Sequence, residues 1–96
     1  MSLPDPERDL LLLRGLIEVF ERLGISVEFA NLSFDDVRGK GGLCRFRDRR
    51  LIILDRQLST REMNELLAAL LAKMDVESLF LPPLVREAIK GMAYDV

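Results

Sequence analysis

The sequence predicts an α+β fold in a single domain over residues 1–96. Two segments carry apolar residues at helical spacing, and short segments between them alternate apolar and polar residues. A chain of 96 residues has room for one hydrophobic core. We therefore expect a three-stranded, mainly antiparallel sheet with two longer helices on one face and a short C-terminal helix. The expected elements are a helix over 5–23, a strand over 25–30, hairpin strands over 43–47 and 50–54, and helices over 60–74 and 83–90.

The first helix and strand are bounded by local signals. Asp5 can cap the amino end of the helix, and Gly24 suits a left-handed cap at its carboxyl end. The strand follows at once, because apolar residues alternate there with polar or small ones: Ile25, Val27 and Phe29. We expect Phe29 to belong to the core.

A hairpin is expected next, with Asp48-Arg49 as its tight turn. This turn places Phe46 opposite Leu51 and Cys44 opposite Ile53, with all four side chains on the buried face. The other face then carries Arg45, Arg47 and Arg50. The alternative is a sheet that is apolar on both faces, which Ile52 and Leu54 favour. Its second face must then be covered by the last helix or by a second copy of the chain.

The second long helix begins with a capping box, in which Ser59 and Glu62 each satisfy the other's backbone amide. Leu67 lies in the middle of the apolar stripe that follows, and we expect it in the core. Pro83 can start the last helix, and Gly91 is expected to stop it.

Composition excludes several kinds of chemistry. The chain has no histidine and one cysteine, so histidine-based zinc sites, catalytic triads and an internal disulfide are excluded. We therefore expect a cytoplasmic protein that is not an enzyme, with no metal, no cofactor and no membrane contact.

Charge is segregated along the chain. The segment 38–61 holds eight basic and two acidic residues, a net charge of +6, whereas the remainder carries −8. The arginines of this segment can pair with the acidic helices, lie on a solvated face, or bind a partner, including a second copy. Nucleic acid is disfavoured, because the rest of the chain is acidic and the pI is about 5.1. In addition, Phe46 is the only aromatic residue in the segment, and the hairpin pattern buries it.

Six residues are candidates for a binding site, and none is a candidate for catalysis. A glycine-rich approach and guanidinium groups suit a small anion, and Cys44 lies between them. The candidates are Gly41, Gly42, Cys44, Arg45, Arg47 and Arg86.

Two resemblances accompany these patterns. A Gly-Gly-x-Cys-Arg strand at residues 41–45, an apolar strand, a leucine-rich helix and a Pro-x-x-Arg-Glu segment at 83–87 resemble a family of small bacterial proteins. That resemblance implies a family and no particular activity. The order of helix, strands and capped helix also resembles small zincin-type metallopeptidases. The helix at residues 65–71 lacks their His-Glu-x-x-His motif, so this likeness implies a scaffold without its metal.

The sequence thus predicts a non-catalytic domain that acts through protein contacts, with a homodimer as the expected assembly. The alternative is a domain that binds a small anion or metabolite through the glycine loop and the hairpin arginines.

Overall fold

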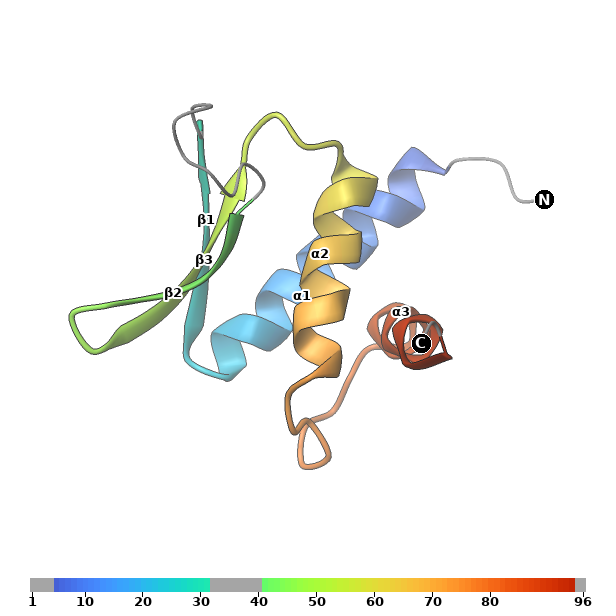
Figure 1. Ribbon diagram of the computed structural model, residues 1–96. Coiled ribbons are helices and arrows are strands. Elements are labelled where there is room, and N and C mark those ends of the chain that lie inside the picture. Colours follow the sequence, from blue (N-terminus) through green and yellow to red (C-terminus); the bar gives the residue numbers. More distant parts are fainter. Residues whose placement is uncertain (1–4, 32–40, 95–96) are drawn as a thin grey trace.

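The computed structural model describes residues 5–31 and 41–94, and over these ranges the protein has an α+β fold (Figure 1). The elements are α1 (Pro6–Arg22), β1 (Ile25–Ala30), β2 (Gly41–Phe46), β3 (Arg49–Asp55), α2 (Thr60–Ala72) and α3 (Pro83–Tyr94). No helix in the described ranges is long and apolar enough to cross a membrane.

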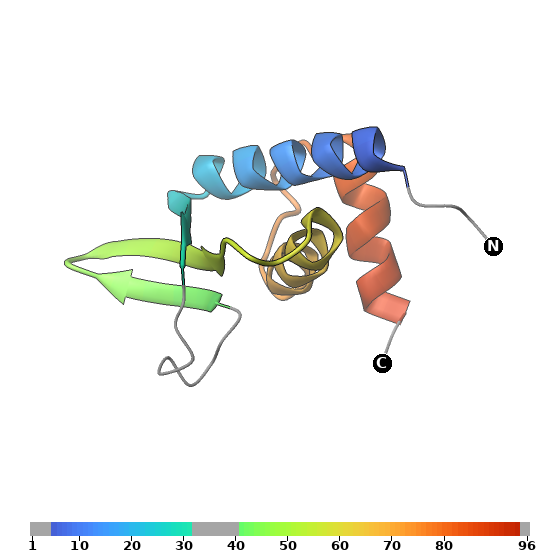
Figure 2. The same cartoon turned by 90° about the horizontal axis from the view of Figure 1, so that it is seen from above.

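The helices form two layers behind the sheet. Helices α1 and α2 lie on one face of the sheet, and α3 packs against both of them on the side away from the strands (Figure 2). The core between these layers consists of side chains that are withdrawn from water, chiefly Leu16, Val19, Phe20, Ile25, Ile52, Leu54, Leu67, Leu71 and Val85. Leu67 is a core residue as predicted, whereas Phe29 is 37% exposed.

The sheet is mixed, not mainly antiparallel. Strand β3 lies in the centre, parallel to β1 and antiparallel to β2. The central position suits β3, because its four consecutive apolar residues (51–54) supply both faces of the sheet. The alternation that identifies each strand carries no information about strand order, so the parallel pair is not predictable from it.

The hairpin turn lies one residue earlier than predicted. Arg47 and Asp48 form the loop with φ angles of 50° and 65°, and Phe46 pairs with Arg49. Two residues with positive φ are the signature of a type I′ turn, whose twist matches that of the strands. The predicted pairing of Cys44 with Ile53 is therefore wrong, since Cys44 pairs with Leu51.

Capping groups hold the helix ends. The Asp5 carboxylate accepts the amide of Arg8 at 3.2 Å, and Gly24 has a φ of 80°. The capping box is present: Ser59 Oγ accepts the Glu62 amide at 3.1 Å, and Glu62 Oε1 accepts the Ser59 amide at 2.9 Å. Helix α3 continues past Gly91, because a glycine inside a helix costs about 1 kcal/mol without breaking its hydrogen bonds.

Two contacts position α1 against the other helices. A Cβ on Gly15 would lie 3.0 Å from Cγ2 of Val85, so the glycine permits a close approach of α1 and α3. Asn64 of α2 is only 4% exposed and donates from Nδ2 to the Asp9 carbonyl at 2.9 Å. This hydrogen bond joins α2 to α1 inside the core.

Candidate functional site

The sheet has one face that α1 and α2 do not cover, and we call it the open face. The strand register assigns its members, because alternate residues of each strand point the same way and paired residues share a face. They are Ser26, Glu28 and Ala30 of β1, Gly42, Cys44 and Phe46 of β2, and Arg49, Leu51, Ile53 and Asp55 of β3.

The open face carries the four residues that the sequence places in the core. Cys44, Phe46, Leu51 and Ile53 do share a face, but Cys44 is exposed, Phe46 is 59% exposed and the other two are half-buried. The residues that enter the core instead are Ile52 and Leu54. Period-two alternation cannot decide between the faces of a strand that is apolar on both sides. The alternative of a sheet with two apolar faces describes β3 correctly.

Charges flank the apolar centre of the open face. Along β3 this face runs from Arg49 through Leu51 and Ile53 to Asp55, so its two ends have opposite charge. Sequence patterning missed both Arg49 and Asp55 as candidates. The signal in the sequence is the apolar run at residues 51–54, which indicates a strand that is apolar on both faces. Arg49 and Asp55 flank this run and lie on the face that the helices leave open.

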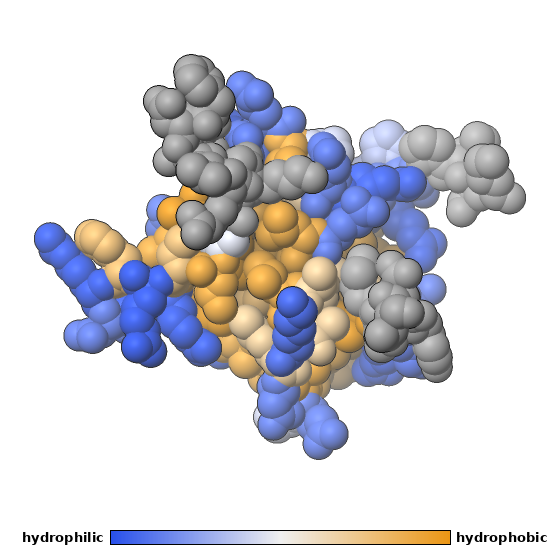
Figure 3. Space-filling view, in the orientation of Figure 1, coloured by the Kyte–Doolittle hydropathy of each residue, from blue (hydrophilic) through white to orange (hydrophobic). Residues whose placement is uncertain are grey.

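The end of the hairpin, residues 45–50, forms a second feature, which we call the hairpin arm. It projects from the body of the protein, and hydrophilic side chains gather on it at the left of Figure 3, apart from the apolar surface in the middle. All six residues are exposed. Arg45, Arg49 and Arg50 line one concave surface beside Gly24, together with the acidic residues Glu21 and Asp48.

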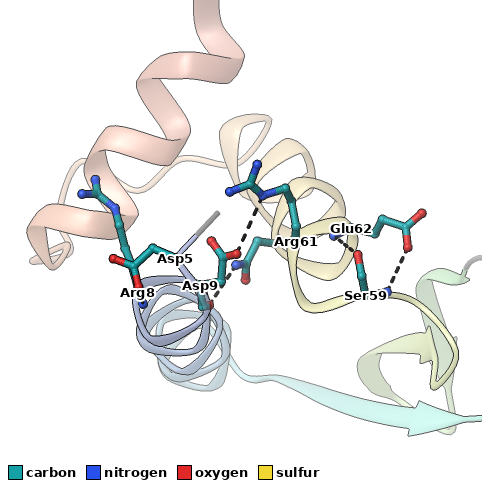
Figure 4. Close-up of polar contacts among 7 residues, drawn as sticks. Asp5, Arg8, Asp9, Ser59, Arg61 and Glu62 are labelled. Carbon is teal, nitrogen blue, oxygen red and sulfur yellow. Dashed lines mark hydrogen bonds and ion pairs between the residues drawn. The ribbon is translucent and has the colours of Figure 1, made fainter. Parts of the chain in front are cut away.

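The arginines of the arm have no carboxylate partner within the described ranges. Arg50 donates to the Leu23 carbonyl at 3.1 Å, and the Arg47 guanidinium lies 5.2 Å from the centre of the Phe46 ring. The ion pairs that the described residues do form lie elsewhere, on the helices: Arg8–Glu87 at 3.5 Å, and Arg61–Asp9 at 3.7 Å (Figure 4). The prediction that the hairpin arginines pair with the acidic helices is therefore not met in these ranges.

The six predicted candidates do not converge on one site. Gly41 and Gly42 belong to β2, and Gly42 is five residues from Arg47, about 16 Å along an extended strand. Arg86 belongs to α3, where its guanidinium donates to the Leu81 carbonyl at 3.4 Å. The small-anion alternative stays a prediction, because Arg45 is three residues from Gly42 on β2 and Gly39 of the glycine loop lies outside the described residues.

No group of three or more acidic, cysteine or histidine side chains is arranged to hold a metal ion in the part of the chain that the structure describes. Comparison of the chain with protein-family models, curated proteins and solved structures finds no match. The two family resemblances therefore stay predictions.

Proposed function

We propose that this protein acts through protein contacts as a homodimer, in which the open faces of two copies pack together. The observation that carries the proposal is the apolar centre of the open face, formed by Cys44, Leu51 and Ile53, which neither α1 nor α2 covers. An apolar sheet face normally packs against a second layer. Full burial of an exposed large aliphatic side chain is worth about 1.5–3 kcal/mol, and Leu51 and Ile53, which are half-buried in the monomer, supply part of this for association.

A second copy of the chain fits this face because the face is self-complementary. When two β3 strands cross antiparallel about a two-fold axis, Arg49 of each copy faces Asp55 of the other. Leu51 then faces Ile53 across the interface. The register of β1 places Ser26 beside Leu51 and Glu28 beside Ile53. In the dimer, Glu28 of each copy therefore faces Ser26 of the other, and like charges do not meet.

The size of the face sets the expected affinity. Three strands of about six residues cover a flat area of about 300 Å². Stable interfaces bury about 800 Å² of accessible surface on each partner. We therefore expect a reversible dimer with a dissociation constant in the micromolar range.

Sedimentation equilibrium tests this association directly. Between about 1 µM and about 500 µM the average mass is expected to rise from that of the monomer toward that of the dimer. A chain that remains monomeric at the highest concentration contradicts the proposal.

Substitution by lysine tests whether the open face, and not another apolar surface, forms the interface. Ile53→Lys places a charge at the centre of the proposed interface and is expected to weaken the dimer at least about tenfold. Leu11→Lys is the matched control, because Leu11 lies on α1 and is 58% exposed. If the control weakens the dimer and Ile53→Lys does not, the interface lies elsewhere.

Charge reversal tests the two-fold arrangement itself. Arg49→Asp is expected to weaken the dimer, because two acidic residues then meet on each side of the axis. Adding Asp55→Arg restores opposite charges and is expected to recover part of the lost affinity. Because Asp55 also accepts the Gln57 amide at 3.0 Å, thermal unfolding of each variant is measured alongside.

The proposed role is recognition without catalysis, in the cytoplasm. The chain has no histidine, and among the described residues the Cys44 thiol contacts only the Gly42 carbonyl, at 3.7 Å. A nucleophilic cysteine needs a neighbouring base. An exposed free thiol also suits a reducing compartment.

A further inference from the structure

The hairpin arm carries a concentration of positive charge that the described part of the protein does not neutralise. Arg45 and Arg50 are direct cross-strand neighbours, and Arg49 follows on the same concave surface. Like charges directly opposite on paired strands are destabilising. Glu21 and Asp48 border this surface, but neither forms an ion pair with these arginines. An anion bound at the arm would relieve the repulsion.

An exposed aromatic ring lies beside two guanidinium groups of the arm, because Phe46 pairs with Arg49 across the hairpin and is followed in the turn by Arg47. Phe46 is 59% exposed and has the Arg47 guanidinium 5.2 Å from its centre. The sequence pattern disfavours nucleic acid in part because it buries Phe46, whereas the structure exposes this ring; the acidic charge of the remaining chain is unchanged. Exposed aromatic rings interleaved with basic side chains are the usual platform for single strands, because bases stack on the ring while phosphates meet the charges.

We propose that the hairpin arm binds single-stranded nucleic acid. Arg49 lies beside Phe46, and Arg45 and Arg50 lie on the opposite face of the hairpin, so a strand that passes around the arm brings its phosphates to all three guanidinium forks, which match phosphate oxygens in a bidentate way. Phe46 stacks on one base. Because phosphate contacts and stacking do not discriminate between bases, we expect no preference for nucleotide sequence. Because the rest of the chain is acidic, binding is confined to the projecting arm and is weak and sensitive to salt. This site shares Arg49 with the proposed dimer interface, where Arg49 faces Asp55 of the second copy, and Arg45, Arg47 and Arg50 of the arm lie outside that interface.

Fluorescence anisotropy with a labelled oligothymidylate of about twelve nucleotides tests the proposal. With about three phosphates neutralised, the logarithm of the association constant is expected to fall with the logarithm of salt concentration at a slope of about −2. A duplex of equal length is expected to bind more weakly, because its bases are not free to stack. Absence of saturable binding at low salt overturns the proposal.

Variants distinguish stacking from charge. Phe46→Ala is expected to weaken binding about 5- to 100-fold, and Phe46→Leu by nearly as much, because leucine lacks an aromatic face. Arg45→Ala and Arg50→Ala, at residues outside the proposed dimer interface, are each expected to reduce the salt slope by about 0.7. Arg8→Ala is the matched control, since Arg8 pairs with Glu87 on the helices and lies outside the arm. Circular dichroism checks that each variant is folded.

Competition identifies other anions. If polyglutamate or inorganic phosphate displaces the oligonucleotide at equal charge concentration and Phe46→Ala has no effect, the arm is a site for acidic protein segments or small anions. That result overturns the nucleic-acid proposal and leaves the dimer proposal untouched.

Discussion

At the residue scale, the most unusual side chain of the core is an amide. Asn64 is 4% exposed, its Nδ2 donates to the Asp9 carbonyl, and no donor among the described residues reaches its Oδ1. A buried oxygen without a donor costs about 1–3 kcal/mol. Asn64 therefore ties α2 to α1 at a cost to stability.

Substitution of Asn64 reveals this cost. Asn64→Leu removes the hydrogen bond and the unpaired oxygen together, and is expected to change the free energy of unfolding by about 1 kcal/mol or less. Asn64→Asp places a carboxyl at the same buried position, where burial raises its pKa above that of the unfolded chain. We expect a loss of about 2–4 kcal/mol at pH 7 that shrinks as the pH falls and the carboxyl takes up a proton. Urea unfolding of both variants at pH 7 and pH 4 measures these changes in the free energy of unfolding. A loss of stability for Asn64→Asp that is larger at pH 4 than at pH 7 would contradict the burial of this side chain.

Exposure also separates two apolar residues that sequence patterning treats alike. Leu67 is fully buried, so Leu67→Ala is expected to cost about 2–5 kcal/mol. Phe29 is 37% exposed near the end of β1, and Phe29→Ala is expected to cost about 1–2 kcal/mol. Chemical denaturation of the pair tests the ranking, and equal losses would mean that Phe29 is more deeply buried than its exposure here indicates.

At the element scale, the hairpin turn is the strained part of the described backbone. Apart from glycine, Arg47 and Asp48 are the described residues with positive φ. Side chains disfavour this region because Cβ approaches the following carbonyl oxygen, although aspartate tolerates it better than most. The strain is local to the arm, and neither residue belongs to the core.

A glycine at the second turn position relieves this strain. Asp48→Gly is expected to stabilise the protein by about 0.5–1 kcal/mol, measured as an increase in the urea midpoint. Asp48→Ala retains a Cβ at positive φ and serves as the control, with no gain expected. A loss of stability for Asp48→Gly would show that the Asp48 side chain supports the turn.

Local patterns predict most elements of this fold and fail where two strands must be placed relative to each other. The helix ends are predictable from the sequence, because each depends on neighbours within a few residues. They are the Asp5 cap, the Gly24 terminus and the Ser59 capping box. The parallel pairing of β1 with β3 depends on tertiary packing. The same packing decides which face of the sheet Cys44 and Phe46 occupy. The open face was therefore not predictable from the sequence pattern either.

At the scale of the whole molecule, charge and apolar surface are distributed unevenly. The positive charge is concentrated on a projecting arm, whose hydrophilic side chains lie at the left of Figure 3, and the apolar centre of the open face lies at the base of the same hairpin. The sequence predicts the segregation of charge but not its position on a protruding element. A dimer through the open faces would engage Arg49 and leave Arg45, Arg47 and Arg50 of each arm available for a second partner.

Cys44 reports directly on whether the open face is covered in solution. It is the only cysteine of the chain, it lies on this face, and it is exposed in the monomer. The decisive measurement is the initial rate constant for alkylation of Cys44 by a maleimide, at protein concentrations from about 1 µM to about 500 µM. This rate constant is expected to fall about fivefold or more as the dimer forms, and Ile53→Lys is expected to keep the monomer value throughout. A rate constant that stays unchanged while the mass doubles would contradict this expectation, because the interface would then lie on another surface.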